Sequence, residues 1–408
     1  MSNKLRVAIS GGGVAGASMI HALLNYSHID AHIFESAPSF REAGIAFGLA
    51  RNATRALGLI GPSATECLAS AGGVPMLGVH FVLGQGPNAG DQVYEADVEQ
   101  RGHATTTLKK LQSVERRADG SLLIQFSDGT SHECDILIGA DGIGSSVRKE
   151  ILEAEDSACI PHNSGAWVIM KLFPSERAQA VLGDAPISIL NAREYGWLAQ
   201  NTFILHNILS DGDLVQYAVC GYDEDAVGSD RRQRLVTRDQ LREMYNGKGW
   251  LPHLERGVEE LLCNEERHDA WYLAEHPPAR TYISGPICVV GDAAHATTAF
   301  QGSGGGMCIE DSMILSSLLG RASSPAEALV ALEVYDQVRR PRTQEIVKSS
   351  WDTGKIFMAL DQDTNLDAEK LKAKLRPRWD FIVDFDIEKS REEALKLFDT
   401  KVKTALGK

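Results

Sequence analysis

Residues 5–16 of the chain read Leu-Arg-Val-Ala-Ile-Ser-Gly-Gly-Gly-Val-Ala-Gly, and this stretch decides the fold. Its first five residues have the character of a buried β-strand, and residues 14–24 carry apolar side chains at helical spacing. The three consecutive glycines therefore fall at a turn that leads from a strand directly into a helix. Such a turn is typical of α/β folds that bind the phosphates of a dinucleotide.

The glycines of this turn each meet a different physical need. Gly11 permits the tight turn, Gly13 lets a pyrophosphate approach the backbone, and Gly16 allows the helix to pack closely on the strand. The first turn of the helix also offers free N–H groups and the positive end of its dipole to the phosphates. The residues that we expect to contact a cofactor here are Gly11, Gly13, Val14, Ala15 and Gly16.

An acidic residue follows at the distance that this kind of site requires. Ile33 and Phe34 end a second apolar run, and Glu35 comes directly after them. A carboxylate about 20 residues beyond the glycines accepts hydrogen bonds from ribose hydroxyls and disfavours a ribose phosphate. The alternative is a glycine-rich turn without a ligand, which the combination of strand, helix and acid disfavours.

Two further motifs narrow the cofactor to FAD. Residues 139–148 read Gly-Ala-Asp-Gly-Ile-Gly-Ser-Ser-Val-Arg and contain Asp141, and residues 290–295 read Val-Gly-Asp-Ala-Ala-His and contain Asp292. In this order and at these separations they indicate a flavin held by one discontinuous domain. A plain nicotinamide dehydrogenase would not need the second and third motifs.

Composition indicates an enzyme with two domains and excludes some partners. The chain has 408 residues and a formal net charge of -14, which argues against nucleic acid or an anionic membrane surface as its main partner. Its seven cysteines are scattered and lack the paired spacing of metal ligands, so we predict reduced thiols and no metal site. No apolar run is long enough to span a bilayer, and we expect a cytoplasmic protein.

The pattern along the chain predicts an α/β protein in which a Rossmann-like FAD-binding domain is interleaved with a substrate domain built on a mixed or antiparallel sheet. A helical C-terminal tail completes it. We predict FAD-binding segments at residues 1–75, 108–158 and 276–345, a shortened substrate-side segment at 76–107, the substrate domain at 159–275 and C-terminal helices at 346–408.

Over nearly its whole length the chain resembles the single-component flavoprotein aromatic hydroxylases, the group of para-hydroxybenzoate hydroxylase, and within it the salicylate hydroxylase-like subgroup. The resemblance implies that Asp141 contacts the pyrophosphate region and the nicotinamide donor, and that Asp292 binds the ribityl chain or ribose of FAD. It also implies that the backbone of four residues faces the flavin ring, that one glycine lies along the flavin and that an arginine contacts FAD. These residues are Gly304, Gly305, Gly306 and Met307, then Gly48, then Arg101.

The resemblance further implies the chemistry. NADH or NADPH reduces FAD, O2 forms a C4a-hydroperoxyflavin, and a phenolic aromatic or polyketide-like substrate is hydroxylated by a monomer or homodimer. A phenol becomes a better nucleophile when it loses its proton, so a base or hydrogen-bond acceptor is expected nearby. His206 and Tyr217, with Tyr222, are the catalytic candidates on the predicted sheet, against the alternative that each is simply packed in the core.

Three departures from the family pattern keep a second hypothesis open. Ala299 stands where relatives usually carry a proline, and residues 167–171 lack an arginine found on that strand in relatives, with Lys171 on the wrong face. Between Arg101 and Leu108 a helix of the relatives is missing. The alternative to an active hydroxylase is therefore a catalytically impaired or non-hydroxylating protein of the same FAD fold.

Overall fold

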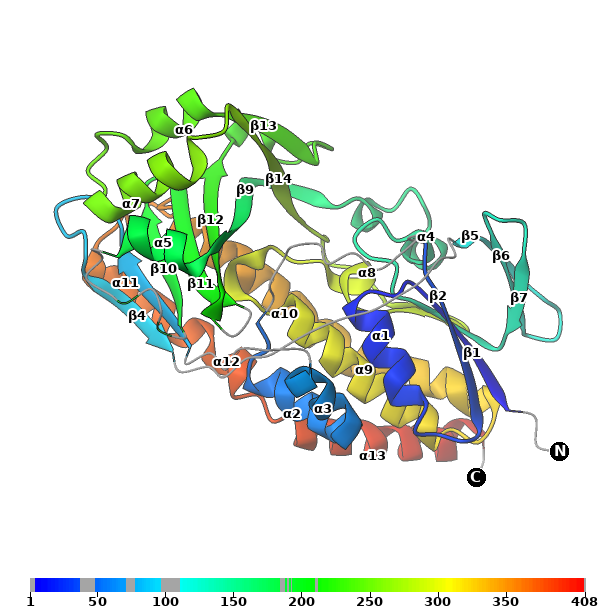
Figure 1. Ribbon diagram of the computed structural model, residues 1–408. Helices are drawn as coiled ribbons and strands as arrows, with labels where there is room; N and C mark the ends of the chain where they lie inside the picture. The colour runs from blue at the N-terminus through cyan, green and yellow to red at the C-terminus, as the bar shows by residue number, and fades with distance from the viewer. Residues whose placement is uncertain are drawn as a thin grey trace.

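The computed structural model describes residues 4–36, 48–70, 78–96, 111–183, 188, 191, 193–209 and 212–406. The two larger β-sheets lie in separate lobes, and long helices run beneath both of them (Figure 1). Arg101, residues 44–47 and the region of the missing helix lie outside the described residues.

A five-stranded sheet forms the centre of the first lobe. Its order is β15-β16-β8-β1-β2, with β15 at Ile283–Ser284, β16 at Ile287–Val289, β8 at Ile136–Gly139, β1 at Leu5–Ser10 and β2 at Ile29–Phe34. The pairs β1–β2, β1–β8 and β8–β16 are parallel. Strands from three distant stretches of sequence thus share one sheet, which confirms the predicted discontinuous α/β fold.

Helices cover both faces of this sheet. α1 (Val14–Leu23) starts directly after the glycine turn and packs on α9 (Gly304–Arg321), while α4 (Ser146–Leu152) follows β8. α10 (Pro325–Phe357) begins where the side chain of Ser324 accepts a hydrogen bond from the Glu327 backbone N–H. It passes from the first lobe to the second (Figure 1), where the Asn201 N–H donates to the Met358 carbonyl at 2.8 Å just beyond its end.

An eight-stranded sheet forms the second lobe. Its strands are antiparallel except for the parallel pair β10–β3, as the predicted mixed or antiparallel sheet requires. In spatial order they are β13 (Gln233–Thr237), β14 (Arg267–Glu275), β9 (His162–Pro174), β12 (Leu214–Tyr222), β11 (Thr202–Leu209), β10 (Glu194–Ala199), β3 (Val79–Leu83) and β4 (Gln92–Ala96).

The two faces of the eight-stranded sheet have different neighbours, because side chains alternate along each strand. One face packs under α5 (Ser175–Leu182), α6 (Arg238–Tyr245) and α7 (Pro252–Gly257), as Figure 1 shows. The other face turns toward the first lobe, where its side chains join Phe300 and Phe357 in one apolar cluster. We call this second face the flavin-side face.

The remaining elements complete the two lobes. They are α2 (Arg51–Ile60), α3 (Pro62–Ser70), a separate three-stranded sheet of β5 (Leu111–Arg116), β6 (Leu122–Phe126) and β7 (Ser131–Cys134), and the helices α8 (Asp292–His295), α11 (Ala368–Leu375), α12 (Asp380–Val383) and α13 (Ile387–Leu406). Within the part of the chain that the structure describes, no helix combines the length and the apolarity needed to cross a membrane. The division into six segments stays a prediction, and its boundary at residue 345 falls inside α10.

Candidate functional site

The three sequence motifs meet at one place. Gly11 has a φ of +108°, and a Cβ atom added to it would lie 2.2 Å from the carbonyl oxygen of Ala140 in the middle motif. Gly291 of the late motif has a φ of +59°, and its added Cβ would lie 2.6 Å from Cβ of Ala15. Only glycine fits at both positions, and its absence of a side chain brings the three segments into contact.

The outward side of the first turn is open. A Cβ added to Gly16 would lie 1.9 Å from the Gly11 carbonyl oxygen, whereas one added to Gly13 would meet no atom of the described residues within 4 Å. The Glu35 carboxylate lies beside the turn and accepts a hydrogen bond from the Gly12 N–H. The two glycines therefore have different roles. Gly16 lets the helix pack onto the strand, and Gly13 faces open space.

Asp141 organises the middle motif. Its carboxylate accepts hydrogen bonds from the Ser145 hydroxyl, the Ser146 N–H at 2.8 Å and the Val147 N–H at 3.2 Å, at the start of α4. Burial raises the pKa of Asp141, and these hydrogen bonds oppose that shift. The side chain is therefore used to hold the N-terminus of α4, a positioning role that the resemblance did not imply.

Arg148 links the middle motif to the late motif. The guanidinium is buried and donates to the carbonyls of Ala293 and Ala294 in α8, at 3.1 and 2.5 Å. It also donates to the carbonyls of Ala158 at 2.8 Å and Pro277 at 3.2 Å. Four separate backbone carbonyls are satisfied by one cation, which fixes α8 against α4.

In the late motif the carboxylate of Asp292 is exposed and the imidazole of His295 is buried. Asp292 is exposed to solvent on one side. Protein atoms crowd its carboxyl group on the other sides, and the resulting loss of hydration raises the pKa of Asp292. His295 is buried, and its Nε2 lies 2.6 Å from Oδ2 of Asp311, the same oxygen that accepts the Gly291 N–H at 3.0 Å. His295 therefore holds the loop, and Asp292 is the group left free to meet a ligand.

A buried network of charged side chains from α9 and α10 supports the loop that carries Asp292 and His295. Arg339 lies 2.8 Å from Asp311 and 2.6 Å from Glu310, and Arg342 lies 2.9 Å from Glu310. The side-chain amide of Asn52 also donates to Glu310, at 2.6 Å. Burial opposes ionisation of Glu310, but the two arginines outweigh it and lower its pKa to about 2. Arg339 itself is completely buried.

The glycine-rich start of α9 lies next to the motifs. Its first turn consists of Gly304, Gly305, Gly306 and Met307. A Cβ on Gly306 would lie 3.3 Å from Ala53 of α2, the helix that Gly48 shortly precedes. Because the Met307 side chain is buried with Ile346, only the backbone of this turn can face a ligand. A helix start of this kind offers N–H groups and a positive dipole end to an anionic group.

His206 and Tyr217 lie on the wrong face of the sheet for catalysis, and this corrects the expectation. They are direct partners across β11 and β12 and point into the core under the helices. Burial lowers the pKa of His206 to about 3, and its ring packs against Tyr195 and Trp197. A Cβ on Gly257 of α7 would lie 2.8 Å from the Tyr217 hydroxyl, so this tyrosine faces α7 and not the first lobe.

Tyr222 is the expected candidate that reaches the flavin-side face. It is partly buried there with Val168, Leu205 and Leu273. Lys171 lies opposite Tyr217 in the sheet and pairs with Glu265 at 3.0 Å, so it cannot replace the missing arginine on the flavin side.

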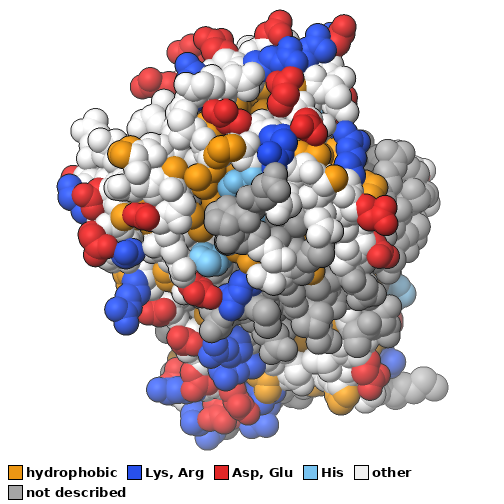
Figure 2. Space-filling model, turned by 60° about the vertical axis from the view of Figure 1, so that its left-hand side comes forward, with side chains coloured by type: hydrophobic (Ala, Val, Ile, Leu, Met, Phe, Trp, Pro, Cys, Tyr) orange, Lys and Arg blue, Asp and Glu red, His pale blue; other side chains and the backbone are white. Residues whose placement is uncertain are grey.

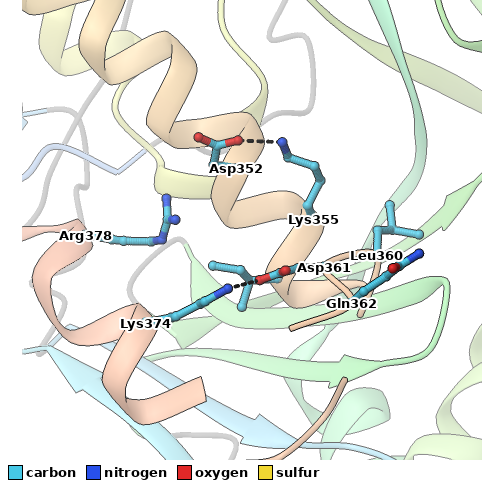
Figure 3. Close-up of a pocket in the computed structure, with 8 residues that line it drawn as sticks. Asp352, Lys355, Leu360, Asp361, Gln362, Lys374 and Arg378 are labelled. Carbon is cyan, nitrogen blue, oxygen red and sulfur yellow. Dashed lines mark hydrogen bonds and ion pairs between the residues drawn. The ribbon is translucent and has the colours of Figure 1, made fainter. Parts of the chain in front are cut away.

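A hollow of about 350 Å³ lies beside the end of α10 (Figure 3). Two ion pairs line it, Asp352 with Lys355 at 2.5 Å and Lys374 with Asp361 at 2.6 Å. Its remaining walls are Ile356, Leu360, Gln362 and Arg378. Sequence reasoning missed this hollow, because its residues come from α10, the following loop and the region of α11 and carry no motif.

Comparison with known proteins decides the family. A model of the FAD binding domain matches residues 256–350. The 6-methylsalicylate 1-monooxygenase of Aspergillus terreus is 31% identical over 425 aligned residues, covering 97% of this chain and 93% of that protein. The chain belongs to the salicylate hydroxylase-like FAD-dependent aromatic hydroxylases. As a member of that family it is an FAD-dependent monooxygenase.

Further relatives of this aromatic hydroxylase agree. A salicylate hydroxylase of Pseudomonas putida is 29% identical, covering 96% of this chain and 94% of that protein. A solved salicylate hydroxylase in a substrate complex superposes with a TM-score of 0.80 at 24% identity, over 97% and 98% of the two chains. CtdE, solved with FAD and a substrate, gives a TM-score of 0.76 at 17% identity. The last two comparisons show that the fold is shared.

The residues of this aromatic hydroxylase fit FAD. Open space in front of Gly13 admits a pyrophosphate, Asp292 offers an accessible carboxylate, and the start of α9 offers backbone N–H groups. These three features lie on segments that the contacts of Gly11 and Gly291 bring together. Arg101, the remaining expected contact, lies outside the described residues.

Proposed function

We propose that this monooxygenase hydroxylates a phenolic aromatic or polyketide-like compound, with NADH or NADPH as the electron donor and O2 as the oxidant. The observation that carries the proposal is the convergence of the three motifs, in a fold whose flavin-side face keeps some side chains, such as Tyr222 and Leu273, only partly buried. The relatives named for 6-methylsalicylate and salicylate support a small aromatic substrate.

Different residues of the chain bind the cofactor, stabilise its charge and orient the substrate. Bound FAD, once reduced, supplies the electrons that activate O2 for transfer of one oxygen atom to the substrate. The turn at Gly13 and the start of α1 hold the phosphates, and Asp292 binds a hydroxyl of the ribityl chain or ribose. The first turn of α9 stabilises negative charge on the reduced ring through its N–H groups. Tyr222, from the flavin-side face, orients the substrate above it.

The competing hypothesis is an FAD-fold protein without hydroxylase turnover. The close packing at Gly11 and Gly291 and the open space at Gly13 favour the active enzyme, because the first two hold the three motifs together and the third leaves room for a pyrophosphate. To test this, the purified protein is examined for flavin colour and for a rise in melting temperature with added FAD. NAD(P)H oxidation stimulated by a panel of phenols, with hydrogen peroxide measured in parallel, then separates hydroxylation from uncoupled oxidation. A colourless protein that FAD does not stabilise would overturn the proposal.

We further propose that the enzyme works in the cytoplasm as a monomer or homodimer. All seven cysteines are free thiols, six of them buried, as suits a reducing compartment. Figure 2 shows acidic and basic side chains interspersed around the rim of one face, with apolar side chains mainly in its centre. Together with the net charge of -14, this favours a small-molecule substrate over a nucleic acid partner.

A further inference from the structure

Glu275 stands where the sheet meets the loop of the late motif. It is the last residue of β14 and follows Leu273, which packs on the flavin-side face with Phe300. The next residue, His276, donates its backbone N–H to the Ala296 carbonyl at 2.9 Å. Glu275 is thereby fixed next to the segment that leads from the late motif to the start of α9.

One carboxylate oxygen of Glu275 has no hydrogen-bond donor among the described residues. This oxygen, Oε2, is buried. Its charged neighbours are Asp352 and Lys355 of α10, which pair with one another at 2.5 Å and line the hollow of Figure 3. Buried carboxylate oxygens almost always have a partner. A ligand hydroxyl is a donor of the right kind.

The surroundings leave this carboxyl group ready to exchange a proton near neutral pH. Burial and the nearby Asp352 raise the pKa of Glu275 to about 7, while Lys355 opposes them. His276 adds no positive charge, because burial and Arg148 lower its pKa to about 3. Above pH 7 the group of Glu275, Asp352 and Lys355 therefore carries a net negative charge.

We propose that Glu275 accepts the hydrogen bond of the substrate's ring hydroxyl, and that the preferred substrate is a phenol with no carboxylate ortho to that hydroxyl. The proposal rests on the proposed function and names its substrate class. A hydrogen bond to a carboxylate increases the electron density of a phenol ring, which favours its attack on an electrophilic oxygen.

Charge explains the exclusion of an ortho carboxylate. Such a group would lie within a few ångströms of the hydroxyl and hence beside Glu275, whose ionised carboxylate would repel it. Lys355 is already neutralised by Asp352. Arg378 has no carboxylate partner among the described residues, but it is held by its own contacts, since it donates to the Ser349 carbonyl and the Thr353 hydroxyl at 3.4 Å each.

The test uses two probes that differ only in that carboxylate, 3-methylphenol and 6-methylsalicylate. Their Kd values for the FAD-loaded full chain are measured from the change in flavin absorbance between pH 6 and pH 8. The wild type should bind 3-methylphenol at least about tenfold more tightly than 6-methylsalicylate, and its affinity for 3-methylphenol should rise with pH as Glu275 ionises. Glu275→Gln should weaken 3-methylphenol binding about tenfold, abolish this pH dependence and improve 6-methylsalicylate binding.

Glu265→Gln is the matched control, because Glu265 pairs with Lys171 on the other face of the sheet. It should change neither affinity. Tighter binding of 6-methylsalicylate by the wild type, no detectable binding of either probe, or a Glu275→Gln protein that keeps the wild-type pH dependence would each overturn the proposal. If Glu275→Gln fails to fold, the pH dependence of the wild type alone decides. A flavin-loaded protein in which no phenol stimulates NAD(P)H oxidation would instead refute the proposed function.

Discussion

Arg339 and Asp311 form a completely buried ion pair, with Nε of the arginine 2.8 Å from Oδ1 of the aspartate, between helices α10 and α9. The other oxygen of the same carboxylate accepts hydrogen bonds from His295 and from the Gly291 N–H. The loop that presents Asp292 is therefore positioned by a cation from a different helix, which lies outside all three cofactor motifs.

Replacement of Arg339 by methionine should be among the most damaging single changes in the chain. It leaves the carboxylates of Glu310 and Asp311 buried without Arg339, and breaking a buried pair in this way costs about 3–5 kcal/mol. Arg340→Met is the control, because Arg340 pairs with Asp336 in a partly exposed site, worth about 0–1 kcal/mol. Urea unfolding measures both, and similar losses for the two variants would contradict the assignment.

Gly11 and Gly13 should respond differently to alanine. At Gly11 the positive φ and the 2.2 Å contact with the Ala140 carbonyl oxygen should destabilise the fold by at least about 2 kcal/mol. At Gly13 a methyl group meets no atom in the part of the chain that the structure describes, so the free energy of unfolding should change by less than about 1 kcal/mol while FAD binding weakens. Thermal unfolding and retained flavin absorbance distinguish the two effects. A Gly13→Ala protein with normal FAD affinity would place the pyrophosphate elsewhere.

Tyr217 and Tyr222 form a matched pair for testing the substrate side. Tyr217→Phe removes a buried hydroxyl that has no hydrogen-bond partner among the described residues, so stability should stay the same or rise by about 1 kcal/mol and turnover should not change. Tyr222→Phe removes a hydroxyl on the flavin-side face and should lower kcat/KM for phenols about tenfold. Stimulated NAD(P)H oxidation measures both. Loss of activity in Tyr217→Phe alone would restore the original expectation.

Stability should fall in mild acid partly because of His206. Its pKa in the folded state is about 3, well below the ordinary value near 6.5 of an unfolded chain. The unfolded state therefore binds a proton that the folded state does not, and stability is lost as pH falls from about 6.5 toward 3. His206→Phe should remove up to about 3 kcal/mol of this loss at pH 4. Equal acid sensitivity of the variant and the wild type in urea titrations would show that His206 becomes protonated without unfolding.

The sequence predicted secondary structure best where an element is determined by residues close to it along the chain. The strand, turn and helix around Gly11 follow from neighbouring residues, and the structure forms all three. The start of α6 is also decided by nearby residues, because Thr237 caps it in a reciprocal pair of hydrogen bonds with Gln240.

The site was harder to predict where the answer depends on which face a side chain occupies. His206 and Tyr217 were sensible choices by residue type, but a strand alternates its faces at every residue, and only the packing of α5 and α7 decides which face is the core. Asp141 and Arg148 stand in a motif that suggests ligand contact, yet they satisfy protein N–H and carbonyl groups. Glu275 belongs to no motif, and its unpartnered oxygen is visible only in the folded chain.

The course of α10 has a consequence for how the molecule comes apart. The helix contributes Arg339 to the first lobe, and its last turns pack with Phe81 and Phe203 of the second. Unfolding of α10 with either lobe would therefore remove Arg339 from the first lobe and the end of α10 from the aromatic cluster of the second. We therefore expect calorimetry to record a single cooperative unfolding transition. We also expect that a chain shortened at residue 345 unfolds in both lobes, because the segment removed includes the second half of α10.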